Sequence, residues 1–172
     1  MASGTKQTTA FLILLLNLGL YTIITIIAAW AVNHGIQRSR ESASGLSVPL
    51  QIFPIYFPFG NMATGFFVIF SLLAGVVGMG TSLIGLQHVK QWDISGIYAV
   101  AASSMMSWSL TLLAMGFACK EINLGYRDSN LRTLEVVTII AGATHMIGTG
   151  AIHAGVGDAI ADAQQRLPGP RS

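Results

Sequence analysis

Residues 10–33 read AFLILLLNLGLYTIITIIAAWAVN, a run that contains no charged side chain. An α-helix needs about 20 mainly apolar residues to cross the hydrocarbon core of a bilayer, so this run is long enough for one span. A signal peptide has an apolar region of only about 7–15 residues. We therefore predict that residues 10–33 form a retained transmembrane helix rather than a cleaved signal.

The composition of the whole chain extends this prediction. Of the 172 residues, 52% are hydrophobic, and only nine Lys or Arg and seven Asp or Glu residues are present. About a quarter of the residues of a soluble domain are charged, so these side chains are too few to cover a soluble surface. This excludes an ordinary cytosolic enzyme and a disordered chain. The net charge of +2 argues against nucleic acid as a partner, and the single cysteine excludes an internal disulfide.

Three further apolar runs follow the first, and the charged residues gather between them. Charge is costly at mid-membrane, so this distribution is typical of a protein that spans the bilayer several times. We predict an all-α integral membrane protein, a four-transmembrane-helix bundle formed by a single domain in the lipid bilayer. The predicted spans are about 10–33, 61–86, 95–119 and 135–156, with tails at 1–9 and 157–172.

A loop rich in proline and aromatic residues is predicted between the first two spans, at residues 41–60. Pro49, Pro54 and Pro58 lie too close together for a continuous helix. The aromatic residues of this loop are Phe53, Tyr56, Phe57 and Phe59. Two interpretations remain open: an anchor in the aromatic belt at the membrane interface, or a lid over the bundle.

Small residues form one stripe on the second span and another on the third, when residues are placed at 100° intervals around a helix. Small residues let membrane helices approach one another closely, so we expect these two faces to pack together. The predicted helix-packing residues are Ser71, Gly75, Gly78 and Ser82 on the second span, Ser104, Ser107 and Thr111 on the third, and Gly142 on the fourth.

The fourth span carries a more polar stripe, which places Glu135, His145 and His153 on one face. His145 lies near mid-membrane, where a polar group needs a partner, and Asn17 and Tyr21 of the first span are candidates. The stripe either fixes the packing of the bundle or forms a polar path or ligand site between helices. A metal site is not expected, because His145 and His153 are two turns apart, about 12 Å.

Cationic residues lie around the connection between the third and fourth spans, namely Lys120, Arg127 and Arg132. Glu121 and Asp128 alternate with them, so local ion pairs are one interpretation. The other is a cationic entrance that an anionic ligand meets first.

Four strings, in this order and spacing, resemble the plant family named after an abscisic-acid-induced wheat plasma-membrane polypeptide (AWPM-like). They are NLGLY at 17–21, LLAGVVG at 72–78, FACKEINLG at 117–125 and IHAG at 152–155. The resemblance covers about residues 10–157. It implies a four-span plasma-membrane protein of land plants, linked to abscisic acid, seed maturation and tolerance of drying and cold. Import of abscisic acid is the activity that the resemblance suggests.

Three functions are therefore considered. The first is a facilitator of abscisic acid uptake, which would need a homo-oligomer because four spans make a small transporter; its candidate binding residues are Asn17, Tyr21, Lys120, Arg127, Arg132, Glu135 and His145. The second is a structural protein that stabilises the membrane during desiccation. The third, an ion or water channel, lacks a ring of charged residues to select ions. No cofactor and no enzymatic activity are expected, since the lone Cys119 has no histidine near it in sequence.

Overall fold

The computed structural model describes residues 2–44, 62–91, 94–123 and 128–166. Within these ranges the chain forms α-helices and no strand, which confirms the predicted all-α fold. The helices are α1 (Ala2–Ser44), α3 (Met62–Gln91), α4 (Ile94–Ile122) and α5 (Ser129–Arg166). α1 continues into the predicted first loop as far as Ser44, and the Pro- and aromatic-rich part of that loop lies outside the described residues.

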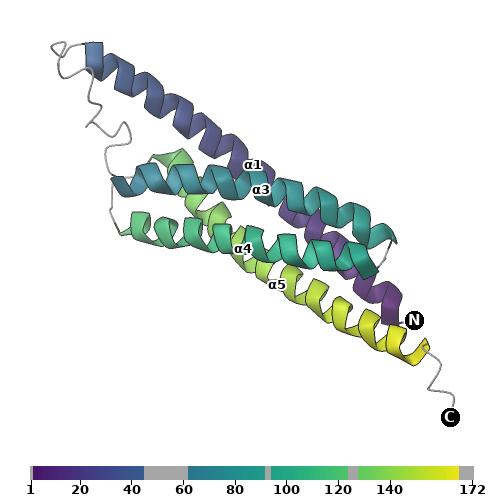
Figure 1. Ribbon diagram of the computed structural model, residues 1–172. Helices are drawn as coiled ribbons and strands as arrows, with labels where there is room; N and C mark the ends of the chain where they lie inside the picture. Colours follow the sequence, from purple (N-terminus) through teal and green to yellow (C-terminus); the bar gives the residue numbers. More distant parts are fainter. Residues whose placement is uncertain (1, 45–61, 92–93, 124–127, 167–172) are drawn as a thin grey trace.

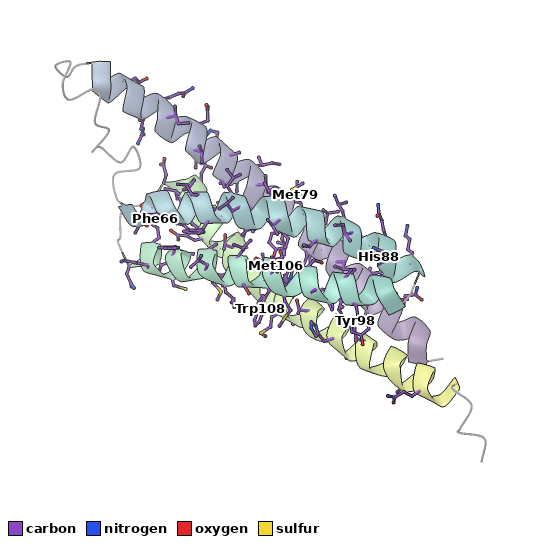
Figure 2. All side chains as sticks on the ribbon, viewed as in Figure 1. Phe66, Met79, His88, Tyr98, Met106 and Trp108 are labelled. Atoms are coloured by element: carbon purple, nitrogen blue, oxygen red, sulfur yellow. The ribbon has the colours of Figure 1, made fainter. Side chains whose placement is uncertain are left out.

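Each of these helices contains a segment that is long and apolar enough to cross a membrane. The segments are Gln7–Arg38 (32 residues), Ala63–Lys90 (28 residues), Tyr98–Ile122 (25 residues) and Ser129–Gly157 (29 residues). Their outward faces carry large apolar side chains: on α4, for example, Met106 is 72% exposed and Tyr98 is also exposed (Figure 2). In a bilayer these faces contact lipid, so the protein is a multi-pass membrane protein.

The helices form a ring in which α1 packs against α3 and α5, and α4 packs against the same two helices. Figure 1 shows that α1 and α5 run obliquely to α3 and α4. The start of α1 and the end of α5 lie at one end of the bundle, together with the end of α3 and the start of α4 (Figure 1). We call this the terminal end. The start of α3, the end of α4 and the start of α5 lie at the opposite end (Figure 1).

Gly75 and Gly78 of the small-residue face of α3 lie against α1, whereas this face was expected to pack on α4. Thr64 of the same face does contact α4, through Glu121. A Cβ atom added to Gly78 would lie 2.5 Å from atoms of the Tyr21 ring, and one added to Gly75 would lie 2.5 Å from Oγ1 of Thr25. The glycines are therefore what lets the large Tyr21 side chain enter the bundle. α3 meets α4 partly through stacked rings instead, since Phe117 stacks on both Phe66 and Phe70.

Two apolar clusters fill the bundle at different levels. One includes Leu14, Val89, Val100 and Ile152 and lies toward the terminal end. The other is larger, contains Tyr21, Ile24, Phe67, Ala118 and Leu134, and extends toward the opposite end. Each helix also contributes buried polar residues, among them Asn17, Ser82, Ser104, His145 and Thr149.

Candidate functional site

His145 is the centre of a buried polar cluster that joins three helices. Its side chain is only 4% exposed. Nδ1 of His145 lies 2.9 Å from the hydroxyl oxygen of Tyr21 on α1. Nε2 lies 3.3 Å from Oγ of Ser104 on α4 and 3.1 Å from the carbonyl oxygen of the same residue. Sequence spacing along α5 directs the imidazole inward, and α1 and α4 supply its partners.

The Tyr21 hydroxyl has a second partner on α4. It lies 2.8 Å from Oγ1 of Thr111, and Thr111 donates its own hydroxyl proton to the carbonyl oxygen of Ser107, 2.8 Å away. Oγ1 of Thr111 can then accept from Tyr21, and this arrangement favours the His145 tautomer whose Nδ1–H donates to the Tyr21 oxygen. A phenol in the apolar interior normally needs such a partner, and here it has two.

Toward the terminal end, the cluster continues through a pair of hydroxyls. Oγ of Ser104 lies 2.6 Å from Oγ1 of Thr149, one turn beyond His145 on α5. His153 follows one turn later, is exposed, and has its Nδ1 2.9 Å from the carbonyl oxygen of Thr149. The two histidines of the polar stripe thus differ in surroundings: one is enclosed by the bundle and the other lies at its rim.

Asn17 is buried close to this cluster but bonds to a different residue. Its Oδ1 accepts a hydrogen bond of 2.7 Å from Oγ1 of Thr144 on α5. The sequence placed Asn17 and Tyr21 as alternative partners of His145, and the structure gives that place to Tyr21. Asn17 instead joins α1 to α5 through its hydrogen bond with Thr144, one residue before His145.

A second buried polar group lies at the end of the bundle opposite the termini. Glu121 on α4 and Glu135 on α5 are each 2% exposed. Thr64 of α3 donates a hydrogen bond of 2.6 Å to Oε1 of Glu121. Within the described residues, Oε2 of Glu121 and the hydroxyls of Ser71 and Thr138 are buried without a hydrogen-bond partner. We call this end the carboxylate end.

Sequence reasoning missed Glu121, because it counted this residue among the alternating charges of a loop. α4 continues through Ile122, so Glu121 is still helical and faces inward. The signal was present: Thr111, Ala114 and Ala118 define the buried stripe of α4, and Glu121 continues its spacing of three or four residues.

Two of the three predicted cationic residues lie within the described part of the chain. Lys120 and Arg132 are exposed at the carboxylate end, outside the buried acids, whereas Arg127 lies outside the described residues. The backbone N–H of Arg132 bonds to the carbonyl oxygen of Asp128, 3.1 Å away, at the start of α5. Glu135 belongs to the interior of this end and is ten residues from His145, about 15 Å along the helix. The described site residues therefore form a central cluster and a separate charged group at the carboxylate end.

Metal binding has no evident site in the described ranges, where no group of three or more His, Cys, Asp or Glu residues could hold an ion. Cys119 is exposed on α4. The polar groups of the interior are hydroxyl, imidazole and carboxyl groups, which make hydrogen bonds with one another.

Comparison of the chain with known proteins identifies a family. The model of the AWPM-19-like family matches residues 15–155. Membrane protein PM19L of Oryza sativa subsp. japonica is 37% identical over 155 residues, which cover 90% of this chain and 82% of that protein. No solved structure gives a significant match.

Proposed function

We propose that this chain, which belongs to the AWPM-19-like family, carries a small amphipathic weak acid across the plasma membrane. Abscisic acid is the substrate that the resemblance suggests. The observation that carries this proposal is the hydrogen-bonded cluster of Tyr21, His145 and Ser104 in the interior of the bundle. Ionisable residues within a span mark substrate or proton pathways more often than ordinary packing sites.

The charges at the carboxylate end support a weak acid as the substrate. Exposed Lys120 and Arg132 attract a carboxylate from solution. Buried Glu121 and Glu135 lie just inside these cations. The hydroxyls of the interior then offer the acid hydrogen bonds.

Four spans make a small transporter, so the proposal includes a homo-oligomer. The exposed apolar faces of α1, α3, α4 and α5 leave room for contacts with further copies as well as with lipid. The carried acid then moves along the polar interior of each copy, with the helices of that copy separating transiently.

Uptake of labelled abscisic acid into proteoliposomes tests the function. We expect saturable uptake by the wild type, and a large loss in His145→Ala. His153→Ala is the matched control, because it removes the same side chain two turns along the same helix but from an exposed position. Uptake no greater than in protein-free liposomes would show that the chain does not carry this acid.

A structural role in stabilising the membrane during desiccation is the second candidate, favoured by the close approach of α1 to Gly75 and Gly78. On this alternative, dehydration tolerance conferred on cells by the protein survives His145→Ala and Lys120→Ala, and is lost when Gly78→Leu separates the helices. Loss of tolerance in the two polar variants, with normal amounts of protein in the membrane, would count against it.

A further inference from the structure

We propose that His145 is the proton-binding site of the bundle, loaded through the hydroxyls of Ser104 and Thr149 from the terminal end. As the coupling site for the carried acid it rests on the proposed function. As a proton-binding site it stands on the geometry around the imidazole ring, which accommodates both protonation states.

In the neutral ring every group has a partner. Nδ1–H donates to the Tyr21 oxygen at 2.9 Å, and Nε2 accepts the hydroxyl proton of Ser104 at 3.3 Å. When the ring carries a second proton, Nε2–H faces the carbonyl oxygen of Ser104 at 3.1 Å. Both N–H groups of the charged ring are therefore bonded without movement of a helix. A histidine that served packing alone would need partners for one state only.

The proton path leads to one end of the bundle. A proton that reaches Oγ1 of Thr149 allows the hydroxyl proton of Thr149 to move to Ser104, and that of Ser104 to move to Nε2, so each hydroxyl keeps one proton. The distance of 2.6 Å between these two oxygens suits such a transfer. On the other side of the ring the chain of hydrogen bonds ends, because Thr111 donates to the carbonyl oxygen of Ser107, which cannot pass a proton on.

Among the residues that the structure describes, the charged ring would have no counter-ion at its own level. On α3 no titratable residue occurs between Met62 and His88, and on α4 the groups are exposed Tyr98 at one end and Cys119, Lys120 and Glu121 at the other. On α1 the neighbour is Tyr21, with His34 and Arg38 farther along the helix. On α5, Glu135 and His153 are about 15 Å and 12 Å away along the helix.

This lack of a counter-ion links the proton to the substrate. Buried charge without a partner is costly, so the proton alone binds weakly. A carboxylate beside the imidazolium supplies the missing negative charge. Proton and acid anion then favour each other's binding, and by thermodynamic linkage the effect is reciprocal.

Ring-nitrogen NMR of histidine-labelled protein in lipid nanodiscs tests this directly. The chain has four histidines, and His145→Asn identifies the signals of His145. We expect the wild-type His145 ring to become doubly protonated as the pH is lowered, and added abscisic acid to shift this change to higher pH. A ring that stays neutral down to the pH at which the protein unfolds would overturn the proposal.

The path is tested by a rapid drop in pH. Ser104→Ala combined with Thr149→Val should slow the protonation of His145, whereas Ser109→Ala, which removes an exposed hydroxyl of α4, should not. Equal rates in both variants would show that protons reach the ring by another route. Uptake assays separate the two proposals. Uptake by a protein whose His145 ring stays neutral would support the proposed function but not the proton site. Protonation of His145 without uptake would support the proton site but not the proposed function.

Discussion

The imidazole of His145 meets the phenol of Tyr21 edge to face, with the ring centroids 5.5 Å apart, the planes at 72° and Nδ1 2.9 Å from the hydroxyl oxygen. The two residues are 124 positions apart and belong to the first and last helices of the chain. Their contact therefore joins the two ends of the sequence in the middle of the membrane. It also makes Tyr21 the residue on which the central cluster depends.

Tyr21→Phe should destabilise the bundle, because it removes one partner from both His145 and Thr111. Leaving buried polar groups unpaired costs about 1–3 kcal/mol in general, and hydrogen bonds between membrane helices average about 0.6 kcal/mol. We expect a loss of about 1 kcal/mol on these scales, measured by reversible unfolding in detergent. Tyr98→Phe, at an exposed position on α4, is the control and should have little effect. Equal losses in the two variants would contradict the assigned role of Tyr21.

Gly78→Ala should also destabilise the bundle, since its Cβ would lie 2.5 Å from the Tyr21 ring and force α1 away from α3. Overpacking of this kind costs about 1–3 kcal/mol. Gly80→Ala is a matched control two residues along, because a Cβ there meets nothing within 4 Å. Alanine favours a helix over glycine by up to about 1 kcal/mol, so this control should be neutral or stabilising. Melting temperatures of the purified variants provide the comparison.

Thr64→Val should destabilise the carboxylate end, because Thr64 gives Oε1 of Glu121 its hydrogen bond of 2.6 Å. Valine keeps the shape of threonine and removes the donor, so the expected loss is about 1–3 kcal/mol. Glu121→Gln in the Thr64→Val background should recover part of this loss, since a neutral side chain needs the donor less. The control is Thr133→Val at an exposed position on α5. The unfolding free energies of the wild type, Thr64→Val, Glu121→Gln and the double variant complete a double-mutant cycle. Additive effects in this cycle would show that the two side chains do not interact.

The exposed cations should affect the rate of uptake through long-range attraction. Lys120→Ala with Arg132→Ala is expected to lower the initial rate of abscisic acid uptake at low ionic strength. The Debye length falls from about 10 Å at 0.1 M salt to about 3 Å at 1 M, so the difference from wild type should disappear at high salt. Lys90→Ala removes a cation from the terminal end instead and is the control for addition from the carboxylate end. A deficit that persists at high salt would point to direct contact rather than attraction.

The sequence predicted the transmembrane helices because their signal is local: charge-free runs such as residues 10–33 have only one stable arrangement in a bilayer. Periodicity also placed the side chain of His145 toward the interior. The sequence did not show which helix each stripe contacts, because the inward face of one helix does not reveal the order of the helices around the ring. The small face of Gly75 and Gly78 was expected against the third span and lies against the first.

Glu121 shows a different limit. A charge close to the end of an apolar run reads as the start of a loop, because charged side chains normally leave the membrane there. Its burial depends on Thr64, a residue of another helix 57 positions away, and no pattern within α4 reveals that partner. Interactions between distant segments decide which borderline residues turn inward.

The lengths of the apolar segments, from 25 to 32 residues, also bear on the kind of membrane that suits this protein. At about 1.5 Å per residue the shortest is about 37 Å long, which exceeds a hydrocarbon core of about 30 Å. A bundle with such hydrophobic excess must tilt its helices, extend their ends into the headgroups or thicken the surrounding lipid. A thicker bilayer would reduce the tilt that these helices need, and a thinner one would increase it.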